Sequence, residues 1–394
     1  MTNDIFSIKY SAINPGTDKT DILFYTDKNQ EKDSVSIFSN VFFKEQNTIP
    51  RIFVTDTNVA KLPLMQSFLE QFCISEKGNF SNGQVFTNGN NTLLILGPGE
   101  PYKTIENVLL IVKTALDKDL QRSSLFIGIG GGVICDMTAF AASIFKRGAQ
   151  LELVPTTLLA MVDASVGGKT GCDFDSYKNM IGTFYPARKL HIFSEFVQLL
   201  PESEYRSGLA ETLKTGLLYA PKLFDIIENN KDSVIKREPD IINQMIRRCV
   251  IAKASIVEKD LTEKGLRMQL NFGHTFGHAL ESRAGLGVIP HGDAVAWGIG
   301  RALELSLKLK LCEKDYKNQV FAVLKNYGWE TNPVHPIMKK NNLTDSIIAQ
   351  DLIEAMRKDK KNSSEKIRFI LQRDINSTVI QEVNTEDVFD ILTN

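Results

Sequence analysis

The stretch LFIGIGGGVICDMTAFAASIF, residues 125 to 145, decides the fold of the first half of the chain. Its apolar start, Leu125 to Ile129, predicts a buried strand, and Val133 to Phe145 has the pattern of a helix. Gly130, Gly131 and Gly132 lie at the turn between them. Glycines at such a turn let the backbone approach a pyrophosphate, whose charge is favoured at a helix N-terminus. The G-x-G-x-x-G motif is absent from its usual setting, so a nucleotide site and an ordinary glycine-rich turn both remain open.

On both sides of this stretch, short β-branched runs alternate with helical patterns. Further strands are predicted at Arg51 to Val54, Thr92 to Leu96 and Leu151 to Val154, and an amphipathic helix at Ile105 to Leu116. Strands that alternate with helices predict a parallel, doubly wound sheet, which is an α/β domain of the Rossmann-like class. Residues 10 to 45 are polar and weakly patterned, and no element is predicted there.

The second half of the chain has a different pattern, which begins near Glu202. Long segments with helical periodicity follow at Ile241 to Glu258, Ala294 to Leu309 and Asp345 to Arg357. A chain of 394 residues exceeds one ordinary core, so two domains of about 200 residues are expected. Pro201 disfavours helix in the residue before it and marks the boundary. We therefore expect an α/β domain in residues 1–200 and a mostly α-helical domain in residues 201–394.

The composition argues against several classes of partner. The hydrophobic fraction of 43% is enough for a normal interior, and a net charge of -1 gives no general attraction to nucleic acid or acidic membranes. The five cysteines contain no C-x-x-C pair, which argues against a disulfide framework or a Cys-zinc site. The start has no basic and then apolar leader, and no apolar run is long enough to cross a bilayer. A cytoplasmic protein without nucleic-acid or membrane partners is expected.

Three of the five histidines fall close together in the second half. His274 and His278 are four residues apart, so both imidazoles lie on one face of a helix, and His291 follows. Zinc accepts histidines together with a carboxylate, with one position left open for substrate, and Glu211 is the candidate carboxylate. Two alternatives stay open. The histidines of the helix could be incidental, and Glu211 could be a surface residue that pairs with a neighbour such as Lys214.

A third cluster contains glycine-flanked lysines. It reads Asp163-Ala-Ser-Val-Gly-Gly-Lys169-Thr, followed by Lys178-Asn179. Such lysines in a loop suit a phosphate, because backbone amides and an ammonium group can both face the anion. The spacing of a P-loop is missing, and two solvated loop lysines are the alternative.

Taken together and in order, these segments resemble the 3-dehydroquinate synthase family, the founding group of the sugar phosphate cyclases. The resemblance runs from about Gly97 to Ala296 and rests on long, specific motifs. In single-letter code they are GEPYK (99–103), GGGVICD (130–136), KRG (146–148), VPTT (154–157), VDASVGGKT (162–170), KNMIG (178–182), GLAE (208–211), GLR (265–267), NFGHTFGH (271–278) and HGDAVA (291–296).

The resemblance implies an NAD-binding α/β domain, a helical domain that binds zinc or cobalt, and a cleft between them. It implies that the metal is held by Glu211, His274 and His291. NAD would contact Asp56, Glu100, Lys103, Gly130, Gly131, Gly132, Asp136, Thr156, Thr157 and Lys178. The substrate would meet Arg147, Lys253, Arg267, Asn271 and Lys360. Catalysis would use Asp163, Lys169, Asn179, Lys214 and His278.

The resemblance also implies a reaction of the shikimate pathway. A sugar phosphate, 3-deoxy-D-arabino-heptulosonate 7-phosphate, is converted to 3-dehydroquinate and phosphate, and NAD is reduced and reoxidised within each cycle. Arg147 would reach the phosphate in a neighbouring subunit, which implies a homodimer. Alternatives are another cyclase of inosose or valiolone type, a metal-dependent polyol dehydrogenase, and a non-catalytic NAD-binding regulator. Two positions depart from the family: Leu199 replaces a cofactor-binding threonine, and the segment from Gly171 to Ser176 is unlike the commoner form.

Overall fold

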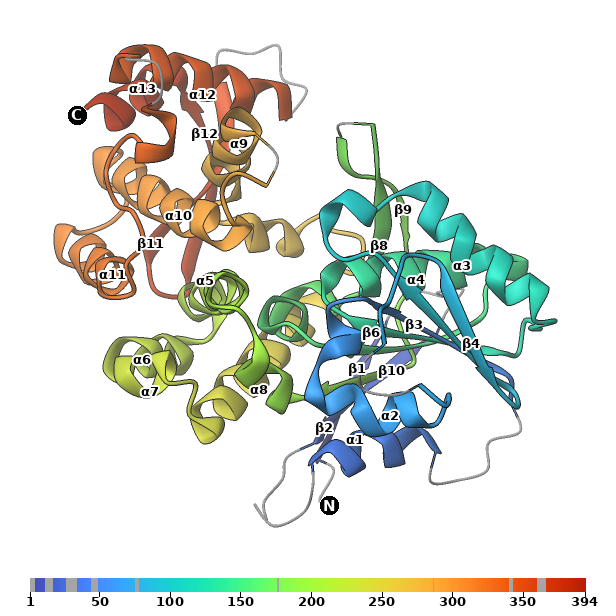
Figure 1. The fold of residues 1–394 in the computed structure, drawn as a ribbon. Helices are drawn as coiled ribbons and strands as arrows, with labels where there is room; N and C mark the ends of the chain where they lie inside the picture. The colour runs from blue at the N-terminus through green and yellow to red at the C-terminus, as the bar shows by residue number, and fades with distance from the viewer. Residues whose placement is uncertain are drawn as a thin grey trace. The chain divides into compact units, whose positions relative to one another are not determined.

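The computed structural model describes residues 4–10, 17–25, 34–43, 49–74, 78–175, 177–285, 287–339, 343–359 and 366–394 (Figure 1). The chain forms two compact units. The first contains Met1–Pro201 together with Lys253–Thr262, and the second contains Glu202–Ala252 together with Glu263–Asn394. The chain therefore passes between the units three times, after residues 201, 252 and 262.

An eight-stranded sheet forms the centre of the first unit, in the order β1-β2-β10-β7-β6-β3-β5-β4. The strands are β1 (Asp4–Lys9), β2 (Lys19–Tyr25), β3 (Arg51–Asp56), β4 (Gln84–Asn88), β5 (Asn91–Leu96), β6 (Leu125–Gly130), β7 (Gln150–Pro155) and β10 (Lys189–Phe193). The edge strands β1 and β4 are antiparallel to their neighbours, and the strands between them are parallel. The predicted α/β class is confirmed, and so are the four predicted strands. Residues 10–45, for which the sequence supported no prediction, contain β2 and α1 (Ser34–Phe43).

Helices cover both faces of this sheet (Figure 1). Helices α3 (Ile105–Asp117) and α4 (Gly132–Ile144) lie on one face, and α1 (Ser34–Phe43) and α2 (Gln66–Glu70) lie on the other. Strands β3 and β6 are buried along their whole length, as expected for parallel strands between two helical layers. On the side of α1 and α2 the packing is aromatic. The ring centre of Phe53 lies 5.1 Å from that of Phe68 and 5.7 Å from that of Phe42.

A two-stranded hairpin of β8 (Lys169–Phe174) and β9 (Tyr177–Phe184) projects from the first unit (Figure 1). This segment holds the glycine-flanked lysines that we expected in a loop, and that expectation is wrong. Glycine makes the pairing possible, because a Cβ atom on Gly182 would lie 2.0 Å from the carbonyl oxygen of Thr170 on the facing strand. A π-helical turn, Ala160–Ala164, precedes the hairpin and carries Asp163.

The second unit is mostly helical, as predicted. Its helices are α5 (Glu202–Tyr219), α6 (Pro221–Asn229), α7 (Lys231–Ile235), α8 (Pro239–Val257), α9 (His274–Ala284), α10 (His291–Lys308), α11 (Lys314–Asn326), α12 (Asp345–Asp359) and α13 (Thr385–Thr393). The last part of α8, from Lys253, belongs to the first unit. One hairpin, β11 (Lys366–Asp374) and β12 (Ser377–Asn384), was not predicted. Within the described ranges, none of the helices is both long and apolar enough to span a membrane.

Helix α10 crosses its neighbours at glycines, and these crossings position the candidate site. A Cβ atom on Gly292 would lie 2.3 Å from Cα of Ser207 on α5. A Cβ atom on Gly298 would lie 2.1 Å from the carbonyl oxygen of Gly273, the residue before α9. The backbones therefore approach more closely than any side chain at these positions would allow. As a result, residues of α5, α9 and α10 can meet at one point.

Candidate active site

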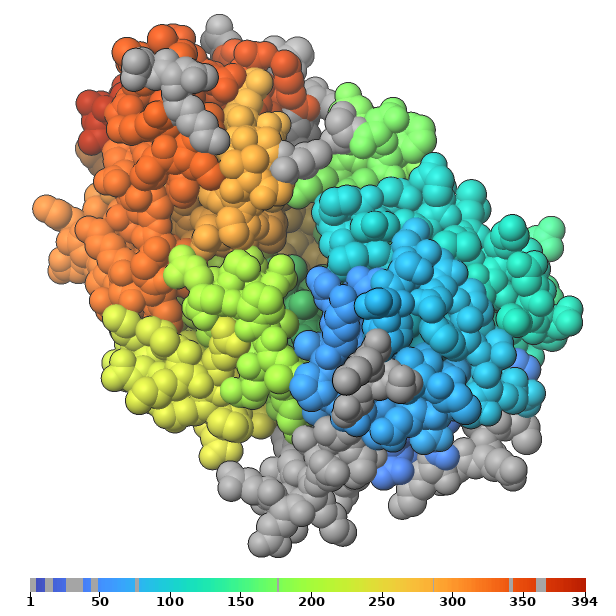
Figure 2. All heavy atoms as spheres, viewed as in Figure 1, coloured from blue at the N-terminus to red at the C-terminus, as the bar shows by residue number. Residues whose placement is uncertain are grey.

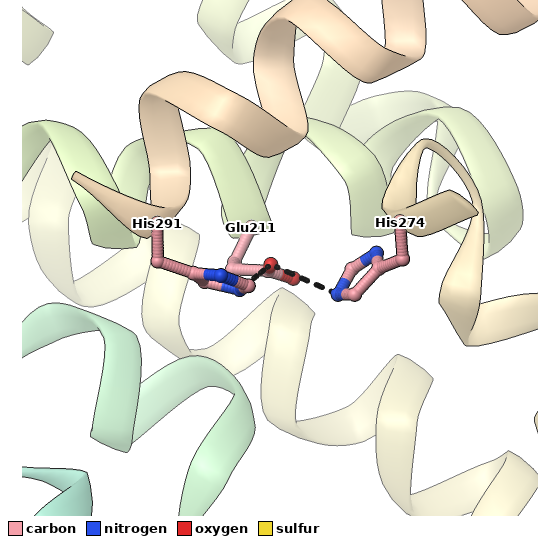
Figure 3. Close-up of side chains that lie close together, drawn as sticks. All are labelled: Glu211, His274 and His291. Atoms are coloured by element: carbon pink, nitrogen blue, oxygen red, sulfur yellow. Dashed lines mark ion pairs between the residues drawn. The ribbon is translucent and has the colours of Figure 1, made fainter. Parts of the chain in front are cut away.

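Glu211, His274 and His291 come from three helices of the second unit and converge (Figure 3). Glu211 lies within α5, His274 is the first residue of α9, and His291 is the first residue of α10. One possible ligand atom from each residue lies within 4.8 Å of those of the other two. The Nε2 atoms of His274 and His291 are 3.6 and 3.4 Å from Oε1 of Glu211. Two imidazole nitrogens and one carboxylate oxygen are donors that zinc accepts in sites with an open position.

The other ring nitrogen of each histidine fixes its orientation. Nδ1 of His274 lies 3.1 Å from the carbonyl oxygen of Phe272, and Nδ1 of His291 lies 3.3 Å from Oε2 of Glu281. A carbonyl and a carboxylate can only accept, so each Nδ1 carries a proton and donates it. In the neutral rings, Nε2 keeps its lone pair and directs it toward Glu211. Metal-binding histidines typically have this arrangement.

Glu211 is 1% exposed, and neither carboxylate oxygen has a hydrogen bond to a residue that the structure describes. Lys214, three residues later in α5, forms an ion pair with it. The pairing with Lys214 that we considered is therefore present, but the burial excludes a surface glutamate. A buried carboxylate is costly unless cations surround it, and a bound divalent ion would supply that charge. The donor set and the orphaned oxygens fit a divalent metal.

The pKa values of the two histidines differ, although both lie beside Glu211. Burial, followed by the charge of Lys214, holds the pKa of His274 well below its usual value, so this ring is neutral. Burial alone would also lower the pKa of His291, but the carboxylates of Glu211 and Glu281, one on each side of the ring, outweigh it and raise the pKa to about 10. In the metal-free protein His291 therefore holds a second proton between two carboxylates. A divalent cation would replace this proton.

His278 lies one turn after His274 in α9 and is exposed. Its ring centre is 5.2 Å from that of His274 and 6.2 Å from that of His291. The structure thus places it beside the three converging donors but not among them. A histidine in this place can exchange protons with a molecule bound at the metal.

The residues expected to bind NAD gather at one edge of the sheet. Asp56 ends β3 and Gly130 ends β6, while Thr156 follows β7 directly, so all three lie at the carboxyl ends of adjacent parallel strands. Nucleotides bind at this edge in open α/β sheets. Gly131 precedes the first residue of α4, Gly132, and a Cβ atom on Gly131 would lie 3.1 Å from the side chain of Thr157. The predicted strand-to-helix turn is present as expected.

A buried lysine of the expected NAD set links Asp136, of the same set, to Asn179, which was expected to take part in catalysis. Nζ of Lys103, which is 5% exposed, donates to Oδ2 of Asp136 at 2.7 Å and to Oδ1 of Asn179. Burial would lower the pKa of Lys103, but the carboxylates of Asp136 and Glu100 outweigh it and raise the pKa. Lys103 is therefore charged at neutral pH. Glu100 and Lys178 are exposed nearby in the same unit.

The expected substrate-binding residues are divided between the two units. In the first unit, Nζ of Lys253 donates to the carbonyl oxygen of Asp163 at 2.6 Å and forms an ion pair with its carboxylate. In the second unit, Arg267 is 1% exposed, and Asn271 donates to Oε1 of Glu263 at 2.6 Å. Two other expected residues, Lys169 on β8 and Arg147 after α4, are exposed. Lys360 lies outside the described residues.

Two residues that the sequence analysis did not single out contact the site. Glu281 accepts a hydrogen bond from His291, and its position could have been noticed because it shares a helix face with His274 and His278. Asp173 accepts a hydrogen bond from the backbone of Asn179. The sequence showed only that the segment with Asp173, Gly171 to Ser176, departs from the family; the contact itself depends on an irregularity in the hairpin.

Comparison with known proteins places the chain in a family. The family model described as the N-terminal part of 3-dehydroquinate synthase matches residues 93–207, and the model of the C-terminal part matches residues 208–362. A 3-dehydroquinate synthase of Acidithiobacillus ferrooxidans is 39% identical over 331 residues, which are 84% of each chain. The chain belongs to the 3-dehydroquinate synthase family. A 3-dehydroquinate synthase of Dictyoglomus thermophilum is 38% identical over 75% of this chain and 80% of its own.

Solved structures outside the 3-dehydroquinate synthases share the fold. The 2-epi-5-epi-valiolone synthase of Streptomyces hygroscopicus, described with NAD+ and Zn2+ bound, matches with a TM-score of 0.78 and 24% identity over 98% of both chains. A 2-deoxy-scyllo-inosose synthase, described as complexed with carbaglucose-6-phosphate, NAD+ and Co2+, matches with a TM-score of 0.77 and 19% identity over 99% of both chains. These likenesses confirm the predicted fold of the 3-dehydroquinate synthase family.

Proposed function

We propose that the chain converts 3-deoxy-D-arabino-heptulosonate 7-phosphate to 3-dehydroquinate and phosphate, a step of the shikimate pathway, with NAD and a divalent metal as cofactors. The observation that carries this proposal is the 39% identity to a 3-dehydroquinate synthase over 84% of both chains. The convergence of Glu211, His274 and His291 supports the metal. The cofactors named for two solved structures of the same fold support NAD and zinc or cobalt.

When bound, the metal would polarise a ring hydroxyl of the substrate, and NAD would accept and return one hydride. Glu211, His274 and His291 would hold the metal through their converging donors. Lys214 would balance the charge of Glu211 and orient its carboxylate. His278, one turn after His274, would move the proton that the reacting hydroxyl releases.

Residues of the first unit would bind the cofactor and the phosphate. The glycine turn, Asp56, Thr156 and Thr157 would contact NAD at the carboxyl ends of the strands, together with Glu100, Lys103, Asp136 and Lys178. Lys169 and Asn179 would hold the substrate phosphate. Lys253, oriented by Asp163, would instead bind the substrate carboxylate. In the second unit, Arg267 and Asn271 would face the substrate carboxylate. A planar guanidinium suits that group because it can donate two parallel hydrogen bonds.

The alternatives differ in measurable ways. The solved valiolone and inosose synthases are only 24% and 19% identical to this chain, and a probable glycerol dehydrogenase of similar fold is 13% identical. A direct assay with the purified protein tests the proposal: phosphate should be released from the heptulosonate phosphate. Metal analysis should find about one zinc or cobalt ion per chain. Steady turnover of a neutral sugar phosphate with none of the heptulosonate would instead indicate another cyclase.

Replacing Arg267 tests the choice of substrate. Arg267→Leu removes the cation that we assign to the carboxylate, so transition-state binding of the heptulosonate phosphate should weaken by about 2 to 4 kcal/mol. Metal content should not change, because Arg267 is not one of the three converging donors. Kinetics on the acidic and on neutral sugar phosphates measure the effect. An unaffected variant would contradict the assignment.

The proposal also includes a cytoplasmic location and a homodimer in which Arg147 reaches the phosphate of the partner. Arg147 ends the short turn Phe145–Arg147 that follows α4 and is exposed, so its side chain is accessible to a partner subunit. Sedimentation at several protein concentrations tests the dimer. Arg147→Ala should then raise KM for the sugar phosphate only if the dimer forms.

A further inference from the structure

The hairpin β8–β9 contains an irregularity at the position where it carries Asn179. Figure 2 shows this hairpin at the surface of the first unit, in light green. Cys172 pairs with Ile181, but Phe174 pairs with Tyr177, so one residue of β8, Asp173, faces three residues of β9. The extra residues form a bulge. At its centre Asn179 has a left-handed backbone with φ of 54°.

Asp173 connects this bulge to the segment around Lys103. Its Oδ1 accepts a hydrogen bond from the backbone N–H of Asn179 at 2.7 Å. Its own N–H donates to the carbonyl oxygen of Lys103 at 2.8 Å, and it forms an isolated β-bridge with Thr104. Asp173 thus binds the bulge with its side chain and the Lys103 segment with its backbone.

Lys103 closes the ring of contacts from the other side. Its ammonium group donates to Oδ1 of Asn179 and to Oδ2 of Asp136. An ammonium group can only donate, so the oxygen of the Asn179 amide must face Lys103. The NH2 group of Asn179 therefore points the other way, and this group is the one that can donate to an anion.

We propose that Asp173 is a positioning residue for phosphate binding, and that it acts through Asn179. It holds the bulge in the left-handed conformation that turns the Asn179 amide toward Lys103. The proposal rests on the proposed function, which assigns the substrate phosphate to Asn179 and Lys169. Asp173 itself is an unsuitable phosphate ligand because its carboxylate would repel the anion.

Two substitutions of Asp173 distinguish the loss of its negative charge from the loss of its hydrogen-bond acceptor. Asp173→Asn keeps an oxygen acceptor for the backbone of Asn179 and removes the negative charge. Asp173→Ala removes the acceptor as well. If Asp173 positions Asn179, the amide variant should bind phosphate as well as the wild type or better, and only the alanine variant should bind it less well.

The experiment measures kcat and KM for the heptulosonate phosphate and the affinity for inorganic phosphate by calorimetry. We expect Asp173→Ala to raise KM and the phosphate Kd by about 10-fold, the loss expected for one charge-assisted hydrogen bond, while kcat changes less. In a protein that already carries Asn179→Ala, Asp173→Ala should raise KM and the phosphate Kd by less than about 2-fold more, because the effects of coupled residues are not additive. Asp175→Asn is the control, since Asp175 is exposed in the same hairpin with φ of 52°, which asparagine tolerates.

Wild-type affinity in Asp173→Ala, or full effects of both substitutions in the double variant, would overturn the proposal. Should Asp173→Ala fail to fold, Asp173→Ser takes its place, because a serine hydroxyl is too short to make the same contact. A wild type that binds phosphate but does not turn over the heptulosonate would overturn the proposed function alone. The effect of Asp173 on phosphate affinity is then still measured. A wild type that binds no phosphate would overturn both.

Discussion

Among single residues, Glu281 orients a predicted metal ligand, His291. It is far from Glu211 along the chain, so the sequence alone did not connect the two carboxylates. It contacts Nδ1 of His291 at 3.3 Å, on the opposite side of the ring from Glu211. A carboxylate in this place keeps the proton on Nδ1 and makes Nε2 a better ligand. Glu281 would therefore tune the affinity for a bound metal through His291, although it is not one of the three converging donors.

We expect Glu281→Leu to weaken Co2+ binding by about 10- to 100-fold, and Glu281→Gln to have a smaller effect because glutamine still offers an oxygen. Competition with a chromophoric chelator, on the metal-free protein, measures this affinity. Glu304→Gln is a matched control, because Glu304 lies on α10 and pairs with Lys317 at 3.2 Å instead of with a histidine. Equal affinities for the wild type and the leucine variant would show that Glu281 only packs against His291.

The sequence identified the residues whose chemical type is rare or whose spacing is regular. His274 and His291 were found because histidines are few and one pair has helical spacing. The partner of Lys253 could not be predicted, since Asp163 is 90 positions away and only the folded chain brings the two together. The carbonyl of Phe272 that orients His274 carries no sequence signal at all, because every residue has one.

Among the elements, the crossing of α5 and α10 controls whether the metal donors meet. Gly292→Ala would place a Cβ atom 2.3 Å from Cα of Ser207, so the two helices must move apart. We expect a loss of about 1 to 3 kcal/mol in the free energy of unfolding and a weaker metal site, because Glu211 and His291 separate. Denaturant titration and metal affinity measure the two effects.

The same helix provides a control for this substitution. A Cβ atom on Gly300 would lie 3.6 Å from its nearest neighbours, which is ordinary van der Waals contact. Gly300→Ala should therefore leave the metal affinity unchanged and stabilise the protein by up to about 1 kcal/mol, as alanine does in a helix interior. If both substitutions behaved alike, close approach at Gly292 would not be what aligns the donors.

Elements buried on both sides were predicted better than elements at the surface. Strands β3 and β6 contain the apolar runs Ile52 to Val54 and Leu125 to Ile129, and such runs are typical of parallel strands under two helical layers. The hairpins β8–β9 and β11–β12 were missed because they alternate irregularly and contain glycine or charged residues. Their pairing depends on partners that the local sequence does not specify.

For the whole molecule, the proposed reaction predicts how NAD is used. Since each hydride is returned within the same cycle, catalytic amounts of NAD should suffice, and no NADH should accumulate during turnover. Absorbance at the NADH band, recorded together with phosphate release, measures both. A steady rise in NADH that matches the substrate consumed would instead indicate a polyol dehydrogenase.

A buried ionic cluster predicts how acid affects the stability of the molecule. Glu152 on β7 lies 2.9 Å from Nε2 of His191 and 2.8 Å from Nε of Arg188. Burial alone would raise the pKa of Glu152, but His191 and Arg188 outweigh it and lower the pKa from 4.5 to about 2. Above pH 4.5 the cluster contributes on the order of 3 kcal/mol, which is lost as the pH falls from 4.5 toward 2.

Unfolding titrations of the wild type and Glu152→Gln, from neutral pH down to pH 2, test whether stability falls with pH in this direction. The variant should be less stable at neutral pH. The difference should shrink as the pH falls from 4.5 toward 2, because the unfolded chain takes up a proton that folded Glu152 binds only near pH 2. A difference that stays constant down to pH 2 would mean that the charge of Glu152 contributes nothing.

The first unit cannot be completed when its first 201 residues have been synthesised, because residues 253–262 also belong to it. Residues 1–201 leave the ribosome without Lys253, which binds Asp163, and without Glu258, whose carboxylate accepts a hydrogen bond from the backbone of Lys9. At 5–20 residues per second, the remaining segment to residue 262 takes roughly 3 to 12 seconds more. During this interval all strands of the sheet have been synthesised, but the first unit still lacks the end of α8 and the residues up to 262. A truncation at residue 201 would leave the first unit permanently without the contacts of Lys253 and Glu258.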